Sequence, residues 1–424
     1  MLLVEAMLTE IRLDDWKSFG SGEHARNTLK LGPVTLLVGP NASGKSNVLD
    51  AIRFLQGAAQ GMTLADVLKG HWEGGRQVWP GIRGHVAEAA RLGSETFQLS
   101  CRFDNDGLGK ADYEIKVSPT GDIHVDEERL WLDDGNDDQS DSQVMVFDTH
   151  WKVAEKLIGR RAGGSIRTAI GTKNEPAASK VCSSLRSLLG QSIVENCQRA
   201  DPSVADLIQL IRHELASVTF LDINPAAMRD YKPISSGPLG VAGENISPVL
   251  YSLEKKRLAD VVDWLSELCA PELEAIAFDK TQLREVMMFL VEKGGHRISA
   301  RSASDGTLRF LGLLVALLTC SEGTLMVLEE PDVGLHPSRI RLLAELFEGL
   351  AKRRGIQILA TTHSPTLLSH LSKETLGDVV AFGRDPQTGW TACSTLADLP
   401  HFATLRDAAD LEHLISTGWL ERAL

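Results

Sequence analysis

The segment VTLLVGPNASGKS, residues 34–46, joins an apolar strand to a loop of the form G-x-x-x-x-G-K-[ST]. Residues 34–38 are apolar or β-branched, which predicts a buried strand. After the loop, Val48, Ile52 and Leu55 recur on one face of a helix. A strand, a glycine-rich loop and a helix in this order predict an α/β protein, and this context makes the loop specific.

The loop has the chemistry of a phosphate-binding site. Its glycines let backbone N–H groups curl around phosphates, and the positive end of the following helix points at them. Lys45 can reach the β- and γ-phosphates, and the Ser46 hydroxyl can ligate Mg²⁺. Kinases, GTPases and ATPases all carry such loops, so later elements must decide between them. The predicted nucleotide-binding residues are Gly39, Pro40, Asn41, Ala42, Ser43, Gly44, Lys45 and Ser46.

Two adjacent carboxylates follow another apolar strand. Residues 324–328, TLMVL, lead directly into Glu329 and Glu330. The carboxyl ends of parallel strands meet at one edge of a sheet, so we expect this pair beside the phosphate loop. Glu329 can hold the metal through water, and Glu330 can orient and deprotonate an attacking water. The pair predicts nucleotide hydrolysis.

A histidine follows the next predicted strand, residues 356–360. His363 in the sequence TTHSP can donate a hydrogen bond to the γ-phosphate and respond to its loss. A lone histidine is more often structural, but its position after this strand favours a role in the site.

The turn SASDGT, residues 302–307, precedes a nearly all-apolar helix, residues 308–318. Ser304, Asp305 and Gly306 place a hydroxyl and backbone N–H groups at the helix start, which predicts an anion site. Because the 39–46 loop already holds a nucleotide, we expect this turn to face the nucleotide of a second copy. The alternative is a purely structural role as an ordinary N-cap before a core helix.

Composition limits the class of protein. The 424 residues include 44 Lys+Arg and 57 Asp+Glu, which gives a net charge of -13, and 43% are hydrophobic. The hydrophobic share is large enough for a sizeable core. The negative net charge argues against a protein that coats nucleic acid with an overall basic surface, but it leaves a local basic face open. The six cysteines form no C-x-x-C pair, which argues against a zinc knuckle or a disulfide framework. No apolar run is long enough to span a bilayer, so we expect a cytoplasmic protein with no membrane partner.

The chain changes character along its length. Short alternating stretches between about residues 95 and 150 predict an antiparallel β lobe, which includes an acidic tract. A basic segment, residues 151–180, follows, and helical patterns then dominate to about residue 270. The last third alternates strands and helices, as in a parallel sheet. One of these helices is predicted over residues 337–354 from the apolar stripe of Ile340, Leu343, Phe347 and Leu350. We predict three parts, residues 1–150, 151–270 and 271–424, with the middle one a helical insert.

Taken in order, GPNASGKS, SASDGT, LMVLEEPDVGLHP and ATTHSP resemble the motifs of the SMC/RecF-like branch of the ABC ATPase superfamily. More closely, the chain is similar to stand-alone bacterial predicted ATPases grouped with the ATPase half of OLD (overcoming lysogenization defect) nucleases. The resemblance extends along most of the chain, including MLTEIRLDDWKSF and LDINPAAMRDY. It implies a P-loop ABC-type ATPase head with an antiparallel β lobe and an inserted helical subdomain.

The resemblance also implies roles for single residues. They are residues 39–46 as the Walker A loop, Ser304 to Thr307 as the signature, Glu329 as the Walker B acid, Glu330 as the catalytic glutamate, Val333 to His336 as the D-loop and His363 as the switch histidine.

Some positions depart from the pattern of ABC transporters. Asp305 stands where transporters carry a glycine, Glu329 where they carry Asp, and His336 where their D-loop ends in Asp. Asp305 and the Glu pair are the pattern of the SMC/OLD-like branch, which weakens a transporter interpretation. Gln98 and Gln143 are candidates for the Q-loop glutamine.

The spacing leaves no room for a long coiled coil between the Walker A loop and the signature. Few residues follow His363, which is small for an appended nuclease domain. We therefore expect an ATPase without its own effector, whose last residues, with Leu411, Leu414 and 419–424, form a closing helix and strand.

These observations predict an ATP-driven dimerising switch. By resemblance, it would be the ATPase component of a bacterial anti-phage defence system that acts with a separate nuclease or toxin. The main alternative is a DNA-binding repair or recombination ATPase of the RecF type, which would use Arg160, Arg161 and Arg167 of the basic segment. A regulator unrelated to DNA, or a scaffold that binds ATP without turnover, stays open.

Overall fold

The computed structural model describes part of the chain, and several predicted features lie outside that part. They include most of the basic segment 151–180, on which the DNA-binding alternative depends, and the closing helix and strand predicted around Leu411, Leu414 and 419–424. The described residues are 6–105, 109–133, 143–150, 165–168, 186, 187, 189, 202–268, 273–399 and 402.

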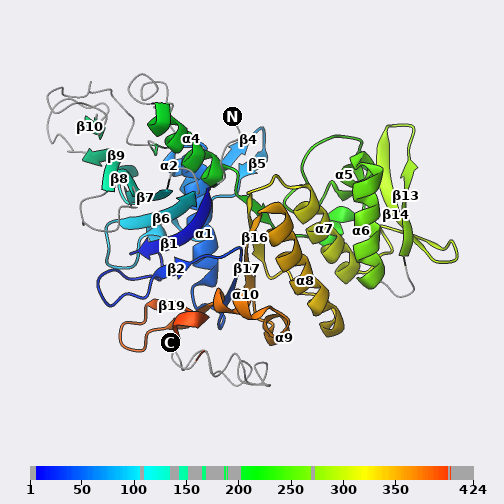
Figure 1. Cartoon of the computed structure of the whole chain (residues 1–424). Coiled ribbons are helices and arrows are strands. Elements are labelled where there is room, and N and C mark those ends of the chain that lie inside the picture. The colour runs from blue at the N-terminus through cyan, green and yellow to red at the C-terminus, as the bar shows by residue number, and fades with distance from the viewer. Residues whose placement is uncertain are drawn as a thin grey trace.

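A mostly parallel sheet forms the centre of the molecule (Figure 1). Its neighbouring strands run parallel, except that the last pair is antiparallel. Every residue of β3 (Val34–Val38) and β17 (Gln357–Thr362) is buried, as expected for strands covered on both faces. The spatial order is β11 (Thr219–Leu221), β16 (Leu325–Glu329), β17 (Gln357–Thr362), β3 (Val34–Val38), β18 (Val380–Arg384) and β19 (Thr391–Thr395).

Alternate residues of these strands enter two different cores. Leu37 and Leu359 pack into one core with α1 (Lys45–Ala59) and α4 (Pro202–Ala216). Their neighbours Leu36 and Ile358 pack into the other core. The period of two along each strand thus holds helices on both faces of the sheet.

An antiparallel sheet covers the first core, with α1 between it and the central sheet (Figure 1). This confirms the predicted β lobe, and the amino-terminal strand joins it by pairing with β6. The strand order is β10 (Ser165–Thr168), β9 (Gln143–His150), β8 (His124–Asp133), β7 (Gly109–Ser118), β6 (Phe97–Asn105), β1 (Met7–Asp14) and β2 (Thr28–Lys30).

Helices and a smaller sheet form the second core. The predicted helix over residues 337–354 is confirmed with the same bounds as α8 (Pro337–Arg354), and α7 (Asp305–Thr319) extends the predicted helix by one turn toward its start. Next to them lie α5 (Ile246–Ser252), α6 (Lys255–Leu268), β12 (Lys232–Pro233), β13 (Leu273–Lys280), β14 (Glu285–Glu292) and β15 (Arg297–Ser299).

The region predicted as a helical insert contributes to several layers. α4 packs on α1, β11 forms an edge of the central sheet, and α5 and α6 pack in the second core. The division into three domains stays a prediction. The remaining elements are α2 (Leu64–Lys69), β4 (His71–Glu73), β5 (Arg76–Trp79), η1 (Val86–Ala89), η2 (Pro225–Met228), α9 (Pro365–Ser369), α10 (Lys373–Gly377) and η3 (Leu396–Asp398).

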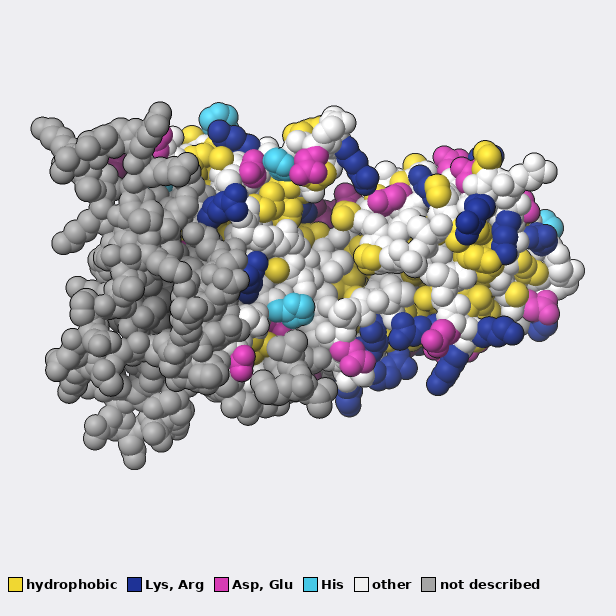
Figure 2. Space-filling model, turned by 90° about the horizontal axis from the view of Figure 1, so that it is seen from above, with side chains coloured by type: hydrophobic (Ala, Val, Ile, Leu, Met, Phe, Trp, Pro, Cys, Tyr) yellow, Lys and Arg dark blue, Asp and Glu magenta, His cyan; other side chains and the backbone are white. Residues whose placement is uncertain are grey.

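Acidic and basic side chains are interspersed over the described surface seen from above (Figure 2). Lys and Arg side chains form a row along the lower right edge of this view (Figure 2), and Asp and Glu side chains interrupt it. Within the described residues, no helix is long and apolar enough to cross a membrane.

Candidate functional site

The loop at residues 39–44 lies between β3 and α1 and requires an unusual backbone. Gly39 has a φ of 148°, Ala42 of 59° and Gly44 of 111°. A Cβ on Gly39 would lie 2.4 Å from the carbonyl oxygen of Phe382. Glycine is therefore needed at Gly39 for both conformation and space, and the loop leads into the N-terminus of α1 as predicted.

Two side chains from the strands β18 and β19 stabilise this loop by hydrogen bonds. Arg384 Nη2 donates to the carbonyl oxygen of Ala42 at 2.8 Å, and Thr391 Oγ1 donates to that of Ser43 at 2.9 Å. Both contacts use carbonyl oxygens of the loop, so they do not engage its backbone N–H groups. Neither residue was predicted, because neither is near the loop in sequence.

The Lys45 side chain folds back onto the first two residues of the loop. Its Nζ donates to the carbonyl oxygens of Gly39 at 2.7 Å and Pro40 at 2.8 Å. Burial lowers the pKa of the Lys45 ammonium, and the nearby Glu330 carboxylate acts against that shift. The cation is thus held where a phosphate can replace its two carbonyl partners.

Glu329 and Ser46 come together across the sheet edge. Glu329 ends β16, which pairs with β17, and β17 pairs with β3. Ser46 Oγ donates to Glu329 Oε1 at 3.4 Å. A hydroxyl and a carboxylate oxygen are hard ligands that suit Mg²⁺ completed by water and phosphate oxygens. Among the described residues, no group of three or more His, Cys, Asp or Glu side chains could hold another metal.

Glu330 points away from Glu329, toward His363. Its φ is 46°, and its N–H donates to the carbonyl oxygen and to Oγ1 of Thr361, both at 3.1 Å. This left-handed turn separates the two adjacent carboxylates. His363 Nε2 lies 3.6 Å from Glu330 Oε1, and both side chains are partly exposed.

The turn before α7 is preorganised by its own side chains and by Arg229. Ser304 is the N-cap, and its Oγ accepts from the N–H of Thr307 at 3.1 Å. Arg229 Nη2 donates to Asp305 Oδ1 at 2.5 Å. Arg229 Nη1 also donates to the carbonyl oxygens of Ala300, Arg301 and Ala303. Sequence reasoning missed Arg229, since a single arginine in a loop carries no signal.

The same turn packs against the predicted D-loop. A Cβ on Gly306 would lie 2.7 Å from the carbonyl oxygen of Gly334, and the neighbouring Val333 side chain is exposed. In the described part of the chain, no hydrogen bond or ion pair joins residues 304–307 to residues 39–46. Polar contacts thus connect Ser46 to Glu329 and Glu330 to His363, and none of the contacts among the described residues connects the turn to the loop.

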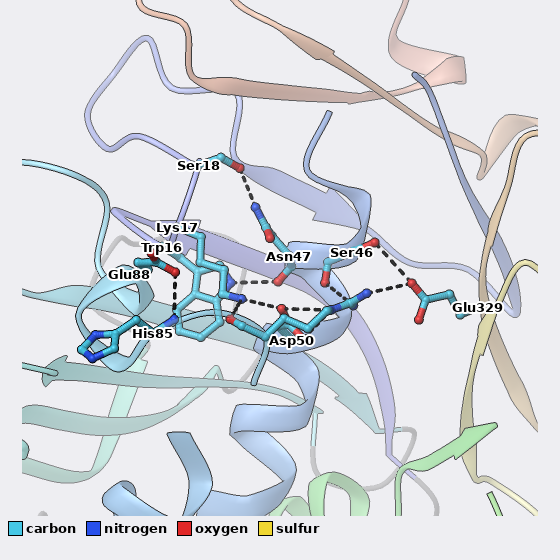
Figure 3. A network of polar contacts seen from close by, with 10 residues as sticks. Trp16, Lys17, Ser18, Ser46, Asn47, Asp50, His85, Glu88 and Glu329 are labelled. Atoms are coloured by element: carbon cyan, nitrogen blue, oxygen red, sulfur yellow. Dashed lines mark hydrogen bonds and ion pairs between the residues drawn. The ribbon is translucent and has the colours of Figure 1, made fainter. Parts of the chain in front are cut away.

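A network that was not predicted surrounds the start of α1 (Figure 3). Arg83 Nη1 donates to Glu329 Oε1 at 2.8 Å, and Arg83 Nε donates to Asp50 Oδ1 at 3.1 Å.

Of the two Q-loop candidates, Gln98 lies within β6 and donates to Glu114, whereas the side chain of Gln143 lies outside the described residues.

A family model described as "AAA domain, putative AbiEii toxin, Type IV TA system" matches residues 34–96 and 196–369, together more than half of the chain. The matched segments contain all the predicted site residues. The strands from β6 to β10 lie between the two segments. A search of curated proteins found no match.

The chain is also similar to solved SMC heads. The SMC head bound to the C-winged helix domain of ScpA has 13% identity and a TM-score of 0.50, with 92% of this chain and 97% of that chain covered. An SMC head domain from Thermotoga maritima has 13% identity and a TM-score of 0.40, with 92% and 98% covered. The first match shows that this chain has the fold of an SMC-type ATPase head, a P-loop ABC fold.

Proposed function

The chain belongs to the family described as "AAA domain, putative AbiEii toxin, Type IV TA system", and on this premise we propose that it binds ATP with Mg²⁺, dimerises around it and hydrolyses it. The phosphate loop would hold the nucleotide through its backbone N–H groups and Lys45. Ser46 and Glu329 would hold Mg²⁺, which, when bound, neutralises charge on the β- and γ-phosphates.

The dimer is supported by one observation: among the described residues, no hydrogen bond or ion pair connects the two predicted anion sites of one chain. The N-terminus of α7 offers a hydroxyl and backbone N–H groups, yet no described polar contact connects it to the 39–46 loop. A two-fold pairing places the same surface of each copy against the other. The turn at Ser304 in one copy would then complete the site of its partner.

Hydrolysis would use the two side chains at the ends of β16 and β17. Glu330 would orient and deprotonate water, and His363, which lies 3.6 Å from it, would donate to the γ-phosphate. Lys45 would stabilise charge on the phosphate oxygens. Separation of the copies would follow, because the γ-phosphate between the loop and the opposing turn is lost.

The test is the mass of Glu330→Gln in solution with ATP and Mg²⁺, measured by light scattering. We expect a stable dimer, because the variant binds ATP and does not hydrolyse it. Glu322→Gln, at an exposed carboxylate before β16, is the matched control and should behave as the wild type. A Glu330→Gln protein that binds ATP and stays monomeric would contradict the dimer.

We further propose that this ATPase acts in a bacterial anti-phage defence system with a separate effector, a nuclease or a toxin. The family description supports this, since it names a toxin and a toxin–antitoxin system, and such systems contain two components. Co-expression with the protein encoded beside it should yield a copurifying pair that lowers phage plating. Lys45→Ala should abolish protection; protection that persists in this variant would separate defence from ATP binding.

A further inference from the structure

Arg83 lies in a tightly constrained loop between β5 and η1. It is framed by Gly81, with a φ of 74°, and Gly84, with a φ of 87°. A Cβ on Gly81 would lie 2.6 Å from the backbone nitrogen of Gly70. This close backbone approach fixes the loop, and with it the starting point of the Arg83 side chain.

The Arg83 guanidinium is held on three sides (Figure 3). Nε donates to Asp50 Oδ1 at 3.1 Å, Nη2 to the carbonyl oxygen of Ser46 at 2.9 Å, and Nη1 to Glu329 Oε1 at 2.8 Å. The planar fork therefore connects α1 to the end of β16. Its third contact is the same carboxylate oxygen that accepts from Ser46 Oγ.

Asp50 and Lys17 hold the Arg83 loop and side chain in this position. The Asp50 side chain is 4% exposed, and Lys17 Nζ donates to its Oδ2 at 2.5 Å and to the carbonyl oxygen of Arg83 at 2.7 Å. The neighbouring Trp16 is buried and donates from Nε1 to the carbonyl oxygen of Asn47 at 2.8 Å. The buried Asp50 carboxylate therefore keeps Arg83 tethered through Nε, whereas the contact of Nη1 with Glu329 is partly exposed.

The Arg83 guanidinium keeps its positive charge over the whole pH range in which proteins are folded. It lies at the carboxylate that the proposed function assigns to Mg²⁺, so a guanidinium and a divalent cation would compete for one acceptor.

We propose that Arg83 is a tethered counterion of Glu329 that must yield this carboxylate when Mg²⁺ and nucleotide bind, so that Arg83 sets the metal requirement of nucleotide binding. The inference rests on the proposed function and deepens it. Its physical basis is charge. A fixed cation lowers the affinity of a neighbouring site for a second cation, and it raises the affinity for a metal-free, highly charged nucleotide.

The experiment measures binding of a fluorescent, non-hydrolysable ATP analogue during MgCl₂ titration, and in EDTA without metal. For Arg83→Gln we expect the Mg²⁺ concentration at half-maximal binding to fall by about fivefold, since the pair is partly exposed and screened. In EDTA, the analogue should bind this variant about fivefold more weakly than it binds the wild type. Circular dichroism checks that the variant is folded.

Two further variants separate charge from shape. Arg83→Lys keeps the cation and loses the fork, so its Mg²⁺ dependence should stay close to that of the wild type. Arg341→Gln removes an exposed guanidinium that pairs with Glu345 on α8, and it should change nothing. The inference is overturned if Arg83→Gln leaves the Mg²⁺ dependence unchanged, or if Arg83→Lys shifts it equally.

If the proposed function is wrong, the same experiment gives a different result. A wild-type protein that does not bind the analogue under either condition would remove nucleotide binding itself. A wild-type protein that binds it equally with and without Mg²⁺ would leave nucleotide binding standing and overturn the role of Arg83.

Discussion

His363 Nε2 lies 3.6 Å from the Oε1 atom of Glu330, so the ends of β17 and β16 bring a ring nitrogen and a carboxylate to one point. Glu330 reaches it because its left-handed backbone turns it away from Glu329. A water beside Glu330 would therefore have a hydrogen-bond donor next to it.

We predict that His363→Ala slows ATP hydrolysis by ~100-fold, at the low end of what one positioned acid–base or donor group contributes. ATP affinity should change little, because in the proposed site Lys45 and the loop backbone supply the ground-state contacts. Steady-state phosphate release and analogue binding measure the two effects. His24→Ala, on an exposed loop residue, is the control. An unaltered rate in His363→Ala would remove this histidine from the site.

Lys45→Ala should weaken nucleotide binding by at least ~100-fold, because a charge-assisted contact to phosphate is lost from a partly desolvated site. The variant also removes the donor that Lys45 provides to the carbonyl oxygens of Gly39 and Pro40. Isothermal titration measures the affinity, and Lys352→Ala on the exposed end of α8 is the control. Wild-type affinity in Lys45→Ala would show that this loop does not bind the phosphates.

Gly306→Ala should prevent the ATP-dependent dimer and leave ATP binding to the single chain intact. The added Cβ would lie 2.7 Å from the carbonyl oxygen of Gly334, so the turn or the D-loop must shift. The matched control is Gly349→Ala within α8, where the nearest atom is the mobile end of Arg353 at 3.5 Å. That change should stabilise the helix by ~1 kcal/mol. Light scattering with the Glu330→Gln background compares both; a dimer unaffected by Gly306→Ala would contradict the role of this turn.

The parts of the fold that the sequence predicted are those with a local pattern. Continuous apolar runs predicted β3, β16 and β17, and the spacing of apolar residues predicted α8 with its observed bounds. The phosphate loop and the carboxylate pair could be placed together because parallel strands end at one edge. β11 was not predicted, since three residues in a helical region carry no period.

The side chains that hold the site in place could not be predicted in this way. Arg83, Arg229 and Arg384 each contact a site element far away in sequence. Each is a single arginine in a loop or at a strand end, and its partners are mostly backbone carbonyls or carboxylates chosen by tertiary packing. Such contacts have no fixed spacing, so only the folded chain reveals them.

The two sheets are connected by a buried amide, which gives a stability prediction. Gln357 Nε2 donates to the carbonyl oxygens of Leu8 at 2.7 Å and Gly32 at 3.1 Å, and the residue is 5% exposed. Gln357→Leu should lower the free energy of unfolding by about 1–3 kcal/mol, because both carbonyls lose a buried donor. Urea denaturation measures this, with Gln387→Leu in an exposed turn as the control. Equal stability of the two variants would show that water replaces the amide.

Glu114 in the antiparallel sheet predicts a pH dependence of stability. Burial raises the pKa of its carboxyl above the ordinary value, although Arg129 and hydrogen bonds from Ser100 and Gln98 act against the shift. The folded state then binds more protons than the unfolded state between the two pKa values, so the unfolding free energy falls as pH rises through that window. Glu114→Gln replaces the carboxyl by an amide that does not titrate, so the variant lacks this fall in unfolding free energy.

The variant should therefore be more stable than the wild type at pH 7, and the difference should shrink as the pH falls below the ordinary carboxyl pKa, where the wild-type Glu114 is protonated in both states. Urea denaturation at pH 4 and pH 7 gives the comparison. Glu95→Gln, at an exposed carboxylate, should leave the unfolding free energy almost unchanged at both pH values. If Glu114→Gln instead loses stability at pH 7, the ionised carboxylate stabilises the sheet through Arg129, and the hydrogen bonds to it outweigh its burial.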